Sequence, residues 1–145
     1  TGTPGARVRI RVINAGSDTA FRFAIGGHTL TITHTDGFPV DPVEVDSVLI
    51  GMGERYDLQV TLDDGVFPVV ADAEGKQDRA FALVRTAAGT APASDVPVAE
   101  LGTGRVGTAA GLSATASVWG VTLLVDGRYQ EGTTGRDVYE SQEVH

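Results

Sequence analysis

Cysteine is absent from this chain of 145 residues. Without a thiol, the chain has no disulfide framework, no thiolate metal ligand and no cysteine nucleophile. Positive charge is scarce, because 11 lysines and arginines stand against 19 acidic residues and leave a formal net charge of −8. This balance argues against nucleic acid or an anionic membrane surface as a partner. The apolar runs are too short to span a bilayer, so the sequence predicts no membrane segment.

The chain does carry enough apolar sequence for one domain of ordinary size. Hydrophobic residues make up 41% of the composition, which is typical of a globular protein and not of a disordered one. The length suits a single core that is large enough to fold alone. The first residue is Thr1, and no charged-then-apolar signal segment follows it. We therefore expect a cleaved or excised piece, or a chain whose start was not recorded.

Short strands joined by tight turns dominate the first 86 residues. From Arg7 to Val12, basic and apolar residues alternate without fault, which is the period of a half-buried strand. Pro39 and Pro42 are expected to break strand pairing. Further strands, bounded by glycine and aspartate turn signals, are predicted at 21–25, 30–32, 43–50, 56–62, 66–71 and 80–84. The pattern predicts an all-β fold, an antiparallel β-sandwich or barrel without an amphipathic helix.

Composition divides the chain into three segments. Residues 1–86 carry the strand pattern and form the expected β-sandwich core. Residues 87–116 are rich in Ala, Gly, Thr and Ser, so we expect a linker or a surface strap. Residues 117–145 hold one additional strand and a polar tail that we expect to be weakly ordered.

Spaced motifs within the first 85 residues resemble the middle cupredoxin-like domain, domain 2, of three-domain laccase-like multicopper oxidases. They are Arg7–Ala15, Phe21, Gly27-His28, Leu30–Ile32, Asp36-Gly37, Pro42, Val45-Asp46 and Gly53–Asp57. The resemblance implies a Greek-key, cupredoxin-like sandwich with flanking cupredoxin domains as partners. It implies a secreted or periplasmic parent oxidoreductase that oxidises phenols or metal ions and reduces O₂ to water. The chain beyond roughly residue 85 matches poorly, and residues 117–145 are interpreted as the crossing to a third domain or as material peculiar to this chain.

The copper ligands of that family have no positions in this chain. The resemblance implies that type 1 copper takes a Cys and two His, and that the trinuclear copper cluster takes His-X-His pairs from the first and last domains. This chain has three histidines, His28, His34 and His145, and they form no such pair. We therefore expect no copper cofactor on this chain alone, an inactive isolated chain, and copper only in the parent enzyme.

One functional position carries over from the resemblance. Fungal laccases hold an acidic residue in the loop after the opening strand, where it contacts the phenolic substrate, and Asp18 falls at the matching place. A carboxylate there would accept the phenolic proton, which is the role of a general base. The alternative is that Asp18 only caps a turn, a common use of aspartate.

His28 and His34 lie beside predicted turns, and histidine is the commonest metal ligand. We expect both to be structural instead, each with a ring nitrogen bonded to a loop carbonyl. Surface metal ligation is the alternative for both residues.

Arg55 is expected to pair with a carboxylate such as Asp36 or Asp57 and to pin the turn. The alternative is that Arg55 orients a partner domain. Tyr56 is expected in the core, with its hydroxyl group reaching the rim.

Two other classes of function stay open at this point. The same strand pattern allows an immunoglobulin-like binding or adhesion module, because a fold does not fix a function. A small metal carrier that uses His28, His34 and His145 is the third hypothesis.

In the resembled family a strand precedes the piece that begins here. A missing strand would leave an exposed sheet edge, so we predict self-association of the isolated chain, a homo-oligomer.

Overall fold

The computed structural model describes residues 2–95, 105–109, 112–118 and 121–126. These residues form eleven strands and no α-helix, which agrees with the predicted all-β class. None of the described segments is a helix that could cross a membrane. The strands are β1 (Arg7–Ile13), β2 (Phe21–Ile25), β3 (Leu30–Thr35), β4 (Phe38–Val45), β5 (Ser47–Ile50), β6 (Arg55–Thr61), β7 (Val66–Ala73), β8 (Arg79–Arg85), β9 (Val106–Gly107), β10 (Ser113–Val118) and β11 (Val121–Asp126).

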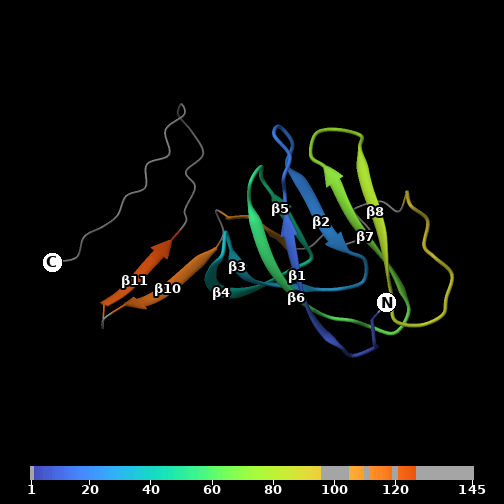
Figure 1. Ribbon diagram of the computed structural model, residues 1–145, viewed down its shortest axis with the longest axis horizontal. Coiled ribbons are helices and arrows are strands. Elements are labelled where there is room, and N and C mark those ends of the chain that lie inside the picture. The colour runs from blue at the N-terminus through green and yellow to red at the C-terminus, as the bar shows by residue number, and fades with distance from the viewer. Residues whose placement is uncertain (1, 96–104, 110–111, 119–120, 127–145) are drawn as a thin grey trace.

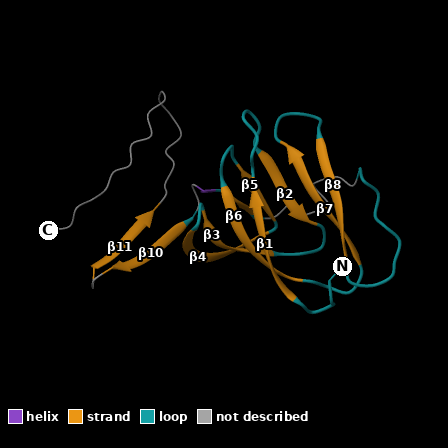
Figure 2. Ribbon diagram, in the orientation of Figure 1, coloured by secondary structure: helices purple, strands orange, loops and turns teal. Residues whose placement is uncertain are grey.

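Two sheets form a sandwich (Figures 1 and 2). One sheet has the order β1-β6-β3-β4 and the other has the order β8-β7-β2-β5-β9, while β10 and β11 pair as a separate hairpin. The chain crosses between the sheets after β1, β2, β4, β5 and β6, which gives Greek-key connectivity. All strand pairs are antiparallel except β5 with β9, which is parallel. The predicted all-β Greek-key sandwich is therefore confirmed.

The core lies between the two sheets and is built by the period-2 alternation of the strands. Tyr56, Leu58 and Val60 of β6 are buried, and the residues between them point outward. Val8 of β1 is partly buried and packs against the same core. Each large apolar side chain that is fully buried there stabilises the fold by about 1.5–3 kcal/mol. Leu112 also belongs to this core, so the chain beyond residue 86 contributes to it.

Residues 87–116, the expected linker or strap, include β9 within the second sheet. Gly107 passes so close to the core that an added Cβ would lie 2.5 Å from the Cδ1 atom of Ile32. The boundary between the expected second and third segments falls within β10. The expected polar tail, from residue 127 onward, lies outside the described residues.

The proline prediction is confirmed in part. Pro39 and Pro42 lie within β4, an edge strand, but the β3–β4 register shifts between Ile32 and His34, and Pro42 has no partner in that register. One detail of the strand prediction is wrong. The predicted strand 43–50 divides at Asp46, because the chain changes sheets there. The backbone N–H group of Asp46 donates to the carbonyl oxygen of Arg105, and the Asp46 carboxylate accepts from the Arg105 N–H group at 2.9 Å.

Because of the strand directions, several of the longer connections lie at the same end of the sandwich. We call this end the loop end. Figure 1 shows the loops after β1, β5 and β7 together at its upper side. The loop end comprises residues 14–20, 36–37, 51–54 and 74–78, and the turns 26–29 and 62–65 lie at the opposite end.

Candidate functional site

Asn14 fixes the loop that carries Asp18. Its side chain is only 4% exposed, although it follows directly after the last residue of β1. The side-chain amide donates to the carbonyl oxygens of Thr19 at 2.7 Å and of Ile50 at 3.2 Å. Its oxygen accepts the N–H group of Gly16 at 2.9 Å. One buried amide therefore ties both ends of the loop to the second sheet.

Asp18 is exposed at the loop end, and Lys76 of the β7–β8 turn faces it. The Asp18 carboxylate accepts the Thr19 hydroxyl at 2.9 Å, and the Lys76 ammonium lies 3.4 Å from its second oxygen. Lys76 also donates to the Thr19 hydroxyl oxygen at 2.5 Å. The Thr19 hydroxyl and the Lys76 charge lower the pKa of Asp18 below its usual value. Asp18 is thus an ionised hydrogen-bond acceptor at neutral pH.

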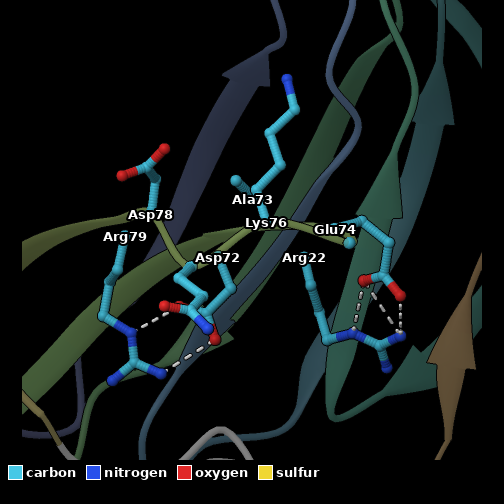
Figure 3. Close-up of a pocket in the computed structure, with 9 residues that line it drawn as sticks. Arg22, Asp72, Ala73, Glu74, Lys76, Asp78 and Arg79 are labelled. Atoms are coloured by element: carbon cyan, nitrogen blue, oxygen red, sulfur yellow. Dashed lines mark hydrogen bonds and ion pairs between the residues drawn. The ribbon is translucent and has the colours of Figure 1, made fainter.

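A shallow pocket of about 280 Å³ lies beside this pair, in the β7–β8 turn. Figure 3 shows two ion pairs on its walls. Arg79 binds Asp72 through two bonds of 2.5 and 2.9 Å, and Arg22 lies 3.3 Å from Glu74. The charges on these walls are therefore largely paired within the pocket.

His28 lies at the end opposite Asp18. Its Nδ1 atom is 2.9 Å from the carbonyl oxygen of Gly26, and its Nε2 atom is 3.0 Å from the backbone nitrogen of Asp63. A carbonyl only accepts and an amide only donates, so the neutral ring must carry its proton on Nδ1. The ring also meets Phe67 edge-on, with centroids 4.4 Å apart. Both ring nitrogens are therefore engaged in structural bonds.

His34 has different neighbours on the outer face of the first sheet. Its Nδ1 atom lies 3.1 Å from the Thr33 hydroxyl and 3.4 Å from the Arg9 guanidinium, so its described partners are side chains and no loop carbonyl. Arg9 and Arg11 both bind the Asp57 carboxylate, the latter at 3.2 Å. His34 thus borders a network of ion pairs.

Arg55 pairs with Asp36 at the β3–β4 turn. The backbone N–H group of Arg55 donates to the Asp36 carboxylate at 3.0 Å, and the guanidinium donates to the Asp36 carbonyl at 3.3 Å. Asp36 has a φ of 48°, a conformation that aspartate tolerates better than most residues. Tyr56 is 1% exposed, its burial raises its pKa, and its hydroxyl lies 3.4 Å from the carboxylate of Glu54.

The structure thus brings Asp18, Asp36 and Arg55 to the loop end and places His28 at the other end. Sequence reasoning missed Asn14 and Lys76, which hold the Asp18 loop. The polar Asn14 directly after an alternating strand was the available signal, because such residues often bond to nearby backbone groups.

The residues present do not fit a copper ion. Cysteine is absent from the sequence, and the ring nitrogens of His28 are both used. Among the described residues, no three His, Asp or Glu side chains gather as a metal site. His145 lies outside the described residues.

Comparison with known proteins identifies relatives of the strand-rich part. Residues 1–91 match the family model described as multicopper oxidase. Over 89 residues the chain is 62% identical to the multicopper oxidase MmcO of Mycobacterium tuberculosis, which covers 61% of this chain and 18% of that protein. A laccase of Cryphonectria parasitica is 44% identical over 63 residues, 43% of this chain and 10% of that protein.

Solved structures agree with these relatives. A laccase of Botrytis aclada matches with a TM-score of 0.56 and 30% identity, over 64% of this chain and 19% of that chain. Fet3p, a multicopper oxidase that functions in iron import, matches in fold with a TM-score of 0.60 and 18% identity, over 66% of this chain and 21% of that chain. The predicted cupredoxin-like fold is confirmed by these matches. The chain spans less than a fifth of the length of the curated relatives it matches. The match across residues 1–91 shows that this chain belongs to the multicopper oxidase family.

Proposed function

We propose that this chain is the metal-free middle domain of a multicopper oxidase, where it serves as scaffold and as part of the substrate wall. The proposal rests on the family match over residues 1–91 in a chain that has no cysteine and no His-X-His pair. The parent enzyme would oxidise phenols or metal ions and reduce O₂ to water, and its copper would be held by other domains. The isolated chain would be inactive.

Copper addition tests the scaffold role directly. We expect the purified chain with added copper to show no intense blue absorption, because that absorption needs a copper–thiolate bond. We also expect it to oxidise 2,6-dimethoxyphenol no faster than the same copper concentration in buffer. Blue absorption, or a rate above the buffer control, would contradict the proposal.

Asp18 is the residue that we place on the substrate wall. It is exposed, and the Thr19 hydroxyl and Lys76 keep it ionised. A carboxylate in this state accepts a hydrogen bond from a phenol and takes the proton when the phenol loses an electron to the enzyme. Its lowered pKa makes it a weaker base, but the acceptor stays charged until the pH falls through that lowered pKa.

An Asp18→Asn variant of the full-length oxidase tests this role. We expect kcat/KM for 2,6-dimethoxyphenol to fall by about tenfold or more, because the amide cannot take the proton. Oxidation of hexacyanoferrate(II), which releases no proton, serves as the matched control and should keep its rate. An equal loss of kcat/KM for both reductants would contradict the proposed contact between Asp18 and the phenolic substrate.

The division of the chain follows the same proposal. Residues 1–86 would form the domain core, residues 87–116 a strap that adds β9, and residues 117–145 the crossing to a third domain. A secreted or periplasmic location stays a prediction from the family resemblance. Self-association also stays a prediction, and β1, one of the edge strands within the described residues, is a candidate surface for it.

The competing hypotheses lose their support. Family membership gives the strand pattern an explanation that needs no immunoglobulin-like adhesion module. A metal carrier would need His28 as a ligand, but both of its ring nitrogens already hold the backbone.

A further inference from the structure

A single lysine lies beside Asp18, on the proposed substrate wall. Lys76 is the only lysine of the chain, whose other permanently positive side chains are arginines. Its ammonium nitrogen lies 3.4 Å from the Asp18 carboxylate and 2.5 Å from the Thr19 hydroxyl oxygen. The Asp18 and Lys76 side chains are 79% and 45% exposed, so both charges are open to a molecule that approaches this carboxylate. Lys76 therefore adds a positive charge at the place where we expect the substrate to bind.

Backbone hydrogen bonds hold the β7–β8 turn, which carries Lys76, against the loop that carries Asp18. The N–H group of Glu74 donates to the carbonyl oxygen of Ala20 at 2.9 Å and joins the turn to that loop. Within the turn, the Lys76 N–H group donates to the carbonyl oxygen of Ala73 at 3.1 Å. An exposed ion pair alone contributes little to stability. The backbone thus sets the position of Lys76 relative to Asp18 independently of the ion pair.

The other cations that line this pocket are paired within it. Arg79 binds Asp72 through two hydrogen bonds, and Arg22 lies 3.3 Å from Glu74. Figure 3 shows the Lys76 side chain pointing away from both pairs. Each pair sums to zero charge, so it has little effect on an ion that approaches from solvent. Lys76 is thus the cation of the pocket that acts on the Asp18 carboxylate.

A carboxylate next to an ammonium group is a poor site for a metal cation. Opposite charges this close largely cancel at a distance, so a divalent ion that approaches Asp18 gains little attraction from it and is repelled by Lys76. Asp78 also lines the pocket. Within the described part of the chain, however, no three His, Asp or Glu side chains gather as a metal site. The pair of Asp18 and Lys76 therefore disfavours divalent cations.

A neutral phenol keeps its binding site on the same carboxylate. A carboxylate can accept about four hydrogen bonds, and Thr19 and Lys76 supply one each to Asp18. Acceptor sites therefore remain for a phenolic O–H group. Because the phenol has no net charge, the charge of Lys76 neither attracts nor repels it to first order.

We propose that Lys76 is a specificity-determining residue of the substrate wall, where its charge makes Asp18 favour neutral phenols over divalent metal cations. The inference rests on the proposed function, and it ranks the two substrate classes that the proposed function leaves open. The effect belongs to the encounter of substrate and enzyme, so it appears in kcat/KM.

Lys76→Met in the full-length oxidase tests this role, because methionine removes the charge and keeps an unbranched side chain. We expect the ratio of kcat/KM for Fe²⁺ to kcat/KM for 2,6-dimethoxyphenol to rise about fivefold at low ionic strength. At about 0.5 M salt the gain should fall below about twofold, because the charge is then screened. Lys76→Arg keeps the charge and should keep the ratio near the wild-type value.

Arg85→Met is the matched control. Arg85 is the last residue of β8 and pairs with Val66, at the end of the sandwich away from Asp18. This variant changes the net charge by the same amount as Lys76→Met, and it should leave the ratio unchanged. Equal gains in the two variants would show an effect of net charge alone and would overturn the proposal.

Failure of this proposal differs from failure of the proposed function. If Asp18→Asn lowers phenol oxidation as predicted but Lys76→Met leaves the ratio unchanged, Asp18 lies on the wall and Lys76 sets no specificity. If neither variant changes the kinetics of any substrate, Asp18 lies away from the substrate. The wall role of the domain is then lost together with this inference.

Manganese(II) gives a test that needs no parent enzyme. Mn²⁺ broadens the NMR signals of nearby amides, so it reports where the ion gathers on the free chain. We expect the amides of Ser17 and Thr19 to broaden at least about twofold more in Lys76→Met than in the wild type. The amide of Gly27, at the opposite end, should broaden equally in both proteins. Equal broadening at Thr19 in the variant and the wild type would overturn the proposal.

Discussion

Replacing Asn14 with alanine should lower the free energy of unfolding of the chain by about 3 kcal/mol, because buried hydrogen-bonding groups lose their partners. The buried wild-type amide donates to the backbone carbonyls of Thr19 and Ile50, both buried residues, and accepts the backbone N–H group of Gly16. Alanine offers no donor or acceptor and leaves these groups unpaired. Urea unfolding followed by far-UV circular dichroism gives the difference directly.

Two further substitutions show whether the lost bonds are the cause. Asn14→Asp keeps the oxygen that binds Gly16 but replaces both donors with a second oxygen facing two carbonyls, so it should destabilise at least as much as alanine. Thr61→Ala, at an exposed position of β6, should change the free energy of unfolding by less than about 0.5 kcal/mol. An Asn14→Ala variant as stable as Thr61→Ala would show that the amide bonds add nothing.

The strands of the first sheet could be predicted from the sequence because their signal is local. Basic residues alternate with Val8, Ile10 and Val12 on β1, and the same period runs along β6. A half-buried strand imposes this pattern on consecutive residues, so it is visible without the partner strand. The absence of copper ligands was equally open to prediction, because it needs only residue counts and spacing.

The contacts that could not be predicted join residues far apart in the chain. The strand expected over 43–50 divides where Asp46 binds Arg105, 59 positions away. Asp18 meets Lys76 across 58 positions. No local period records such meetings, since they depend on how the two sheets pack. The pairing of Arg55 with Asp36 was among the expected ion pairs, because an arginine beside a turn commonly binds a nearby carboxylate.

The second large predicted effect on the free energy of unfolding comes from replacing His28, compared with the same replacement at His34. His28→Ala should lower the free energy of unfolding by about 3 kcal/mol, because the Asp63 N–H group and the Gly26 carbonyl lose their partner and the edge-on contact with Phe67 disappears. His34→Ala should lower it by no more than about 1 kcal/mol, since its described hydrogen-bond partners are side chains and its surroundings are half-exposed. Urea unfolding of the two variants side by side measures both values.

The pair also separates a structural histidine from a metal ligand. A ring whose nitrogens both hold the backbone stabilises the fold equally with and without metal ions. The loss on His28→Ala should therefore be the same in EDTA and in added copper. If copper stabilised the wild type but not His28→Ala, the ring would have a lone pair available for metal. The hydrogen bonds to Gly26 and Asp63 would then not account for the role of His28. The proposal that this domain is metal-free would lose the support that it draws from this buried histidine.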